Sequence, residues 1–313
     1  MSVSKGRHRS SRVSRRTMLA WLAGAIGVVA AAGVTGFELV DHGVLPGKQV
    51  LDELDGGCDV TSTALSFASL GPSLSAQFNS KARNRSVGYT IAYPPGHHVG
   101  DELPLVVMLH GYDNNHRTAF FGMSPAQAVA LTRHGARMNP VALVTVDGGN
   151  GYWNPHPGDD PQAMVVDELI PLCQGRGLGR GANGIRMMGI SMGGYGALAI
   201  AERHEGLVSS VAAISPAIWT SYDQARAANP EAFASKKAFD DGNVITHASR
   251  LSSVAVRVAS GVDDPFHPGV VTLAKALPTA SQVVFSSGCH TEPFFIEQEP
   301  PSLRFMSLVD VHG

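Results

Sequence analysis

The sequence predicts an α/β fold, with a mostly parallel β-sheet that carries helices on both faces. The first observation behind this prediction is an alternation: from about residue 86 to the C-terminus, short apolar runs alternate with helix-length segments, which is typical of a parallel sheet with crossover helices. The second is the composition of the 313-residue chain. With 44% hydrophobic and only 16% charged residues, most of the chain is not kept disordered by repulsion between its charges. No internal repeat is visible, so a single α/β domain of about 230 residues explains this part of the chain.

Each expected element follows from its local pattern. Short apolar runs predict strands at residues 86–93, 103–109, 141–146, 185–189, 208–214, 254–259 and 282–285. The segments between them predict helices at residues 124–137, 164–174, 192–204, 270–277 and 301–311. Ser124 is a favourable N-cap for the first of these helices, because its hydroxyl can accept a backbone N–H that the helix leaves unpaired.

The charges of the chain are distributed unevenly. Residues 1–37 hold six basic residues and no acidic one, and the remainder holds 18 basic and 26 acidic residues, a net charge of −8. The pair Arg15-Arg16 precedes an uncharged stretch, 18–37, so residues 1–37 resemble a twin-arginine export signal or a membrane anchor. An ordinary amphipathic first helix is the alternative, but the stretch has no polar face. We therefore expect an exported protein, secreted or associated with the cell envelope, which could contact the membrane through this segment.

The rest of the chain divides into an extension and a catalytic domain. Residues 38–80 lack clean periodicity and are expected to form a linker and an irregular extension, whereas residues 81–313 are expected to form the domain. The acidic domain has no long run of Lys or Arg, which argues against a nucleic-acid partner. Three cysteines allow one disulfide and one free thiol; we consider the pair Cys58 and Cys173, although spacing alone does not establish it. No pair of cysteines has the spacing of metal ligands.

A nucleophile motif follows the predicted strand at 185–189. Gly189-Ile190-Ser191-Met192-Gly193 has the form Gly-x-Ser-x-Gly between a strand and a helix, and a further glycine stands at 194. In this context the serine occupies a tight turn at the edge of the sheet, and small residues on both sides let the chain pass closely. The alternative is a plain strand-to-helix turn with a serine N-cap. We expect Ser191 to be a nucleophile.

A serine nucleophile needs a base, and the base needs an acid that orients it. His290 directly follows the predicted strand at 282–285, where a residue of the active-site edge belongs, while His204 and His312 lie in less suitable places. Asp263 and Asp264 follow the predicted strand at 254–259 by a short turn that contains glycine. The order Ser, acid, His is that of the α/β-hydrolase fold, and the residues alone leave the choice between the two aspartates open.

Two further strand ends carry candidate site residues. After the strand at 103–109 comes His110-Gly111-Tyr112, where the α/β-hydrolase fold supplies one backbone donor of the oxyanion hole. We expect the N–H groups of Tyr112 and Met192 to form this hole, and His110 to support the loop rather than act as the base. The loop after 141–146 contains Asp147, Tyr152 and Trp153. With His110 and Gly111 these residues are the candidates for substrate binding, although Trp153 could equally cover the sheet edge.

Four motifs of the domain resemble a known family. They are Leu109-His110-Gly111-Tyr112, the segment 189–197, Gly261-Val262-Asp263-Asp264-Pro265-Phe266 and Gly288-Cys289-His290. Residues 86–312 resemble the esterase D type of the "putative esterase" family, a group of α/β-hydrolases that includes secreted actinobacterial mycolyltransferases and feruloyl esterase modules. The resemblance implies that Asp264, which closes a Gly-x-x-Asp turn, is the acid. The tryptophans that usually follow the family's histidine are absent, since Thr291-Glu292-Pro293 stands there, so substrate specificity does not carry over.

These features predict an exported serine carboxylic-ester hydrolase with Ser191, His290 and Asp264 as its triad. The expected partner is a small-molecule or lipid ester, and neither a metal nor an organic cofactor is expected. An acyltransferase that uses the same triad, and moves the acyl group to a sugar or lipid hydroxyl, is the first alternative. A catalytically silent scaffold of the cell envelope is the second, and the intact triad residues argue against it.

Overall fold

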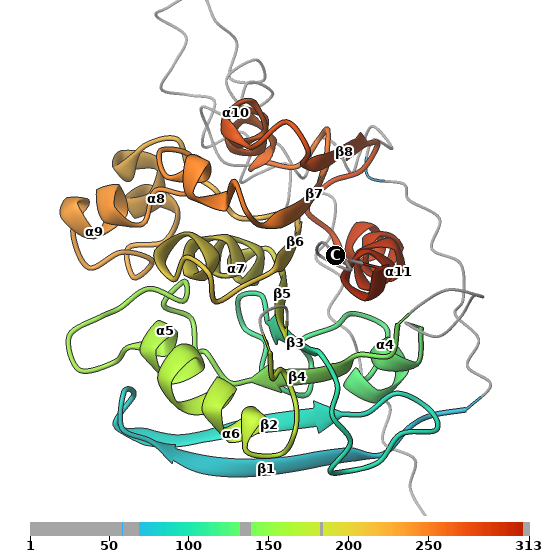
Figure 1. The fold of residues 1–313 in the computed structure, drawn as a ribbon. Coiled ribbons are helices and arrows are strands. Elements are labelled where there is room, and N and C mark those ends of the chain that lie inside the picture. The colour runs from blue at the N-terminus through green and yellow to red at the C-terminus, as the bar shows by residue number, and fades with distance from the viewer. Residues whose placement is uncertain (1–57, 59–68, 132–138, 182–183, 309–313) are drawn as a thin grey trace, which may run out of the picture.

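A computed structural model describes residue 58 and residues 69–131, 139–181 and 184–308. In this part of the chain one sheet has the strand order β1-β2-β4-β3-β5-β6-β7-β8 (Figure 1). The strands are β1 (Ser73–Ser80), β2 (Arg85–Ala92), β3 (Leu105–Leu109), β4 (Ala142–Val146), β5 (Ile185–Ile190), β6 (Ser210–Ile214), β7 (Ala255–Gly261) and β8 (Gln282–Ser286). The α/β prediction is confirmed, and all seven expected strands are present within a few residues of their predicted bounds.

The sheet is parallel from β4 through β8, and antiparallel where β2 pairs with β1 and with β4. Every residue of β3, β4, β5 and β6 is buried. Their near-continuous apolar sequences suit this position, because a parallel strand is covered by helices on both faces. The carboxyl ends of these parallel strands therefore share one edge of the sheet, which we call the active-site edge.

Helices cover the two faces unequally (Figure 1). The helices of the described residues are α4 (Pro125–Leu131), α5 (Pro161–Ala163), the π-helix Met164–Leu169, α6 (Ile170–Gln174), α7 (Met192–Arg203), α8 (Tyr222–Ala228), α9 (Lys236–Asp241), the 3-10 helix Ala248–Leu251, α10 (His267–Ala276) and α11 (Glu292–Leu308). The larger core lies on the face with α6, α7 and α10. The smaller core lies on the opposite face, under α4 and α11. Each core closes one side of the active-site strands.

Strand β1 and helices α8, α9 and α11 differ from the sequence-based expectation. Strand β1 lies within 38–80, which was expected to be irregular; its sequence alternates polar residues with Leu74, Ala76 and Phe78, a period of two that is typical of a strand and that the expectation missed. Helices α8 and α9 were not predicted, because they are short and mostly exposed. Helix α11 begins at Glu292 rather than near residue 301, and it contains Pro300 and Pro301 in its interior. Prolines usually mark a helix boundary, and here the packing of α11 on the sheet outweighs that preference.

The cysteine pairing considered from the sequence is wrong. Cys58 forms a disulfide with Cys289, which lies between β8 and α11. Cys173 is a free thiol buried on α6, packed within the larger core. Because its side chain is enclosed by that core, it is held away from the active-site edge where Cys289 lies.

The predicted leader 1–37 lies outside the described residues, as does most of the extension before β1. No helix in the described ranges is both long enough and apolar enough to cross a bilayer.

Candidate active site

Ser191 occupies a strained turn between β5 and α7. Its backbone angles are φ 55° and ψ −118°, a conformation that costs a residue other than glycine on the order of 1–3 kcal/mol and that clusters at functional sites. The flanking glycines permit the turn. A Cβ on Gly189 would lie 2.1 Å from the carbonyl oxygen of Gly193, and a Cβ on Gly193 would lie 2.0 Å from that of Leu109. The motif therefore fixes Ser191 at the active-site edge through contacts that tolerate no side chain.

The structure brings the three predicted triad residues together. The hydroxyl Oγ of Ser191 lies 2.8 Å from Nε2 of His290, and Nδ1 of His290 lies 2.8 Å from Oδ2 of Asp264. Asp264 is only 2% exposed, and its other carboxylate oxygen accepts the backbone N–H of Phe266 at 2.8 Å. The arrangement suits proton transfer from the hydroxyl to the imidazole, with the carboxylate oriented behind it.

The structure distinguishes the two adjacent aspartates. Only the carboxylate of Asp264 contacts His290, whereas Asp263 contributes its backbone N–H to the carbonyl oxygen of Gly288 at 3.1 Å. The pair thus serves the histidine loop in two ways, one through a side chain and the other through the main chain.

Two backbone amides lie beside Ser191 without an acceptor. Within the described residues, the N–H groups of Tyr112 and Met192 donate to no protein atom. Met192 is the first residue of α7, where helix geometry leaves the amide unpaired and the helix dipole is positive. Gly111 packs against the nucleophile, since a Cβ there would lie 3.7 Å from Cβ of Ser191. That the Tyr112 and Met192 amides form an oxyanion hole remains a prediction, and this placement is compatible with it.

His110 is fully buried, and its ring holds the loop before Tyr112. Its Nε2 accepts the N–H of Gly148 at 2.9 Å, so Nδ1 carries the proton and donates to the carbonyl oxygen of Gly111 at 2.7 Å. Burial lowers the pKa of His110 to about 4, so the ring is neutral near pH 7. In a trans peptide the C=O and N–H groups point in opposite directions. By holding the Gly111 carbonyl, His110 therefore fixes the direction of the Tyr112 amide.

The other candidate substrate residues have structural contacts. The carboxylate of Asp147 accepts the N–H groups of His116 at 2.7 Å and Gly88 at 3.1 Å, which ties the oxyanion loop to β2. Trp153 is fully buried, and its indole donates to the carbonyl oxygen of His110 at 3.2 Å. Of the two alternatives for Trp153, the structure therefore shows packing. These contacts give Asp147, Trp153 and His110 a role in supporting the loops; that they line the substrate site stays a prediction.

Aromatic rings that the sequence analysis did not select surround the triad. The rings of Phe266 and Phe295 contact His290 edge to face, with centroids 5.1 and 5.0 Å away. Trp219 packs on Phe266 and on Tyr152, which is 5% exposed. Phe266 and Phe295 follow Asp264 and His290 closely in sequence, and this proximity was the available signal. Trp219 comes from the β6–α8 connection and had no such signal.

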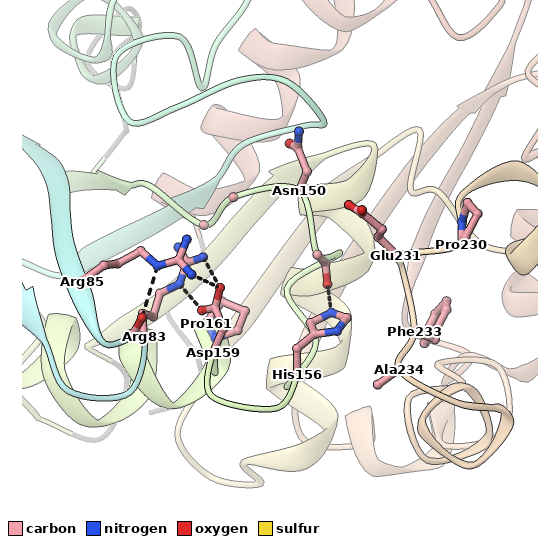
Figure 2. Close-up of a pocket in the computed structure, with 13 residues that line it drawn as sticks. Arg83, Arg85, Asn150, His156, Asp159, Pro161, Pro230, Glu231, Phe233 and Ala234 are labelled. Carbon is pink, nitrogen blue, oxygen red and sulfur yellow. Dashed lines mark hydrogen bonds and ion pairs between the residues drawn. The ribbon is translucent and has the colours of Figure 1, made fainter.

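A polar cavity of about 410 Å³ lies next to the oxyanion loop (Figure 2). One wall carries Arg83 and Arg85, which share the carboxylate of Asp159 at 2.6 to 3.0 Å. Glu231 and Phe233 form the opposite wall. Asn150 connects the cavity with the active site, because its side chain bonds to the backbone N–H and the carboxylate of Asp113, the residue after Tyr112. The cavity was not predicted, since its walls come from segments far apart in the sequence.

Acidic, histidine and cysteine side chains form no cluster of three or more that could hold a metal ion in the part of the chain that the structure describes.

Comparisons with known proteins identify the fold and the family of the chain. The family model "Putative esterase" matches residues 80–268, more than half of the chain. A ferulic acid esterase superposes with a TM-score of 0.63 at 20% identity, covering 76% of this chain and 98% of that one. An S-formylglutathione hydrolase from Agrobacterium tumefaciens gives 0.61 at 16% identity, with 80% and 98% covered. The fluorophosphonate-binding serine hydrolase F of Staphylococcus aureus gives 0.60 at 13% identity, with 76% and 99% covered.

No curated protein matches the chain. The structural similarities at these low identities establish the α/β-hydrolase fold, and the match to the family model establishes the family. The resemblance inferred from the four motifs is thereby confirmed: the chain belongs to the putative esterase family and is an esterase-type enzyme of the α/β-hydrolase fold.

Proposed function

We propose that the protein is an exported serine carboxylic-ester hydrolase that works through an acyl-enzyme. The observation that carries this proposal is the unbroken hydrogen-bonded series from Ser191 Oγ through His290 to Asp264, with 2.8 Å at both steps. The strained turn at Ser191 and the two unpaired amides beside it are the further parts that ester cleavage requires.

The acylation step uses all of these groups. Nε2 of His290 takes the proton of the Ser191 hydroxyl while Oγ forms a bond to the ester carbonyl carbon. The electron pair of the carbonyl bond moves to its oxygen, which the amides of Tyr112 and Met192 stabilise. When the intermediate collapses, the bond to the leaving alkoxide breaks, and the alkoxide takes the proton from His290. Asp264 stabilises the imidazolium that exists between these two transfers.

Deacylation repeats the sequence with water in place of serine. His290 removes a proton from water, the hydroxide oxygen attacks the acyl carbonyl, and the proton then returns to Ser191 Oγ as the acid leaves. The triad thus ends in its starting protonation state, and no metal or organic cofactor takes part in any step.

The polar cavity favours acyl transfer as a second candidate function. Arg85 and Glu231 face one another across it, and hydroxyl groups can donate to a carboxylate and accept from a guanidinium at the same time. The cavity would then hold a polar part of the substrate or a hydroxyl-bearing acceptor such as a sugar or a lipid headgroup. With a hydroxyl of the acceptor in place of water, the same triad would carry out transfer.

Export is proposed on two features of the chain. The basic, then uncharged, leader 1–37 has the pattern of a twin-arginine signal or a membrane anchor. The disulfide between Cys58 and Cys289 is of a kind that persists in oxidising compartments outside the cytoplasm.

The test is covalent labelling of the purified enzyme with a fluorophosphonate, together with hydrolysis of p-nitrophenyl acetate. We expect both in the native enzyme and neither in Ser191→Ala. Ser249→Ala is the matched control, since Ser249 is exposed at the opposite end of the sheet, and it should behave like the native enzyme. Labelling that persists in Ser191→Ala would refute the assignment, and absence of all activity would favour the silent scaffold. Partition of the acyl group between water and added trehalose separates hydrolase from transferase.

A further inference from the structure

The histidine loop, residues 287–291, joins β8 to α11 and carries the proposed base. On its C-terminal side the loop runs directly into α11, where the N–H of Phe295 donates to the carbonyl oxygen of Thr291 at 3.1 Å. Phe294 and Phe295 anchor this end of the helix in the smaller core. The residues after His290 are therefore held by a packed helix.

The N-terminal side of the loop has a different support. Gly288 adopts φ 137°, a backbone region open essentially to glycine alone, and glycine leaves the chain more conformational freedom than any other residue. Its carbonyl oxygen accepts the N–H of Asp263 at 3.1 Å. Between this glycine and His290 stands Cys289, which is fully buried and bonded to Cys58, 231 positions away in the sequence. A covalent bond thus restrains the loop one residue before the base.

We propose that the Cys58–Cys289 disulfide positions His290 for catalysis, adding a covalent restraint to the backbone contacts that Gly288 makes with Asp263 and Gly261. This inference rests on the proposed function, because the role it assigns is to keep both imidazole nitrogens at hydrogen-bond distance. His290 must reach Ser191 and Asp264 together, at 2.8 Å each. Misplacement of a catalytic group by about 1 Å can cost on the order of 10²-fold in rate.

Cys58 lies outside residues 80–268, which match the family model. The disulfide therefore links the extension before β1 to the histidine loop. Cys58 and Cys289 are positioning residues in this scheme, since neither contacts Ser191 or Asp264 in the structure.

The third cysteine does not interfere with a redox test. Cys173 is buried on α6, and burial raises the pKa of its thiol to about 12, so it is a poor nucleophile for disulfide exchange. Dithiothreitol would reduce one bond: one thiolate of the reagent attacks a sulfur of the Cys58–Cys289 pair, and its second thiol displaces the mixed disulfide. Two protein thiols and one cyclic oxidised reagent result.

The decisive variant is Cys58→Ser, which opens the bond and leaves the sequence of the histidine loop intact. We expect kcat for p-nitrophenyl acetate to fall about tenfold or more, with KM within twofold, and the rate of fluorophosphonate labelling to fall in parallel. Dithiothreitol should bring the native enzyme to the same level and reoxidation should restore it, while Cys58→Ser should not respond. Cys173→Ala is the control and should respond to the reagent as the native enzyme does.

Two measurements distinguish a loss of His290 positioning from a loss of overall stability. They also distinguish failure of this inference from failure of the proposed function. Assays are run well below the unfolding transition, with near-ultraviolet circular dichroism to verify that the reduced enzyme stays folded. Hydrogen exchange at residues 287–291 should rise on reduction, whatever the activity of the enzyme. A folded, reduced enzyme with native kcat and native exchange in the loop would overturn the inference. Absence of Ser191-dependent activity in the oxidised enzyme would instead overturn the proposed function, and the exchange measurement would still decide whether the bond restrains the loop.

Discussion

The nucleophile turn and the histidine loop present the two sides of one site, and they are held in place by different means. Ser191 is fixed by its immediate neighbours, since Gly189 and Gly193 pack so closely that neither tolerates a Cβ. His290 is fixed largely by distant parts of the chain, namely the carboxylate of Asp264, the ring of Phe266 and the bond to Cys58 through Cys289. The ring of Phe295, on the helix that follows, adds a near contact.

This difference in support indicates which part of a serine-histidine site can be built in more than one way. The residues that match the family model, 80–268, include the nucleophile turn and Asp264 but not the histidine loop. A locally encoded turn can be specified by a short motif, whereas a loop supported by distant contacts can be supported in more than one way. In this chain one of the supports is Cys58, which lies outside the matched residues.

The largest effect should come from the carboxylate that supports the histidine side. Asp264→Asn keeps the size of the side chain but removes the charge that orients and stabilises the imidazolium, so kcat should fall by about 10⁴-fold. The neighbouring Asp263→Asn is the control, because Asp263 contacts the loop through its backbone N–H alone, and it should stay within a few-fold of the native rate. Steady-state hydrolysis of p-nitrophenyl acetate measures both. Equal losses in the two variants would contradict the assignment of Asp264.

A substitution in the nucleophile turn should affect stability as well as rate. Gly193→Ala places a Cβ 2.0 Å from a backbone oxygen, so the turn must shift, and we expect the free energy of unfolding to fall by about 3 kcal/mol together with a large loss of kcat. Gly206→Ala is the matched control, because Gly206 has φ 81° and open space around it. It should cost only about 1 kcal/mol and leave kcat unchanged. Urea denaturation would refute this reasoning if both variants lost the same stability.

A pH titration would test how the oxyanion loop is held. The pKa of His110 is about 4 in the folded protein against 6.5 for a free histidine, so below pH 6.5 the unfolded chain binds a proton that the folded protein does not. The native enzyme should therefore lose stability relative to His110→Gln as the pH falls from 6.5 to 4, by up to about 1.4 kcal/mol per pH unit. Chemical denaturation of both proteins over this range gives the difference. A difference that does not change with pH would show that His110 is not buried as a neutral ring.

The smallest effect is expected in the polar cavity, which contacts neither side of the triad directly. Glu231→Gln should leave the kinetics of p-nitrophenyl acetate within twofold of the native values, because this ester is too small to span the cavity. With esters that carry a hydroxyl-rich group, KM should rise several-fold, since a carboxylate accepts stronger hydrogen bonds than an amide. Arg85→Gln tests the opposite wall in the same assay. A uniform change of kcat for all esters would place the effect at the triad instead.

The same contrast explains how much the sequence could predict. Ser191 and the sheet around it follow from a short motif and from apolar runs, which are local properties. His290 was found through its place after β8, and Asp264 over Asp263 only through resemblance to a family. The pairing of Cys58 was wrong, because spacing carries no information on which cysteines the fold brings together. Trp219, which packs on Tyr152 and Phe266, and the cavity between Arg83 and Glu231 depend on long-range packing, which no local pattern reports.

The disulfide also changes how the chain is connected. Because Cys58 is bonded to Cys289, the polypeptide between them forms a covalent ring, and a single peptide cleavage between residues 59 and 72 would open this ring without releasing a fragment. Any processing that is meant to free the catalytic domain from its leader must therefore cut before residue 58. If the leader stays in a membrane, the catalytic domain is attached to it through Cys58 in two ways: by the peptide chain that leads to β1, and by the disulfide to Cys289, beside the proposed catalytic histidine.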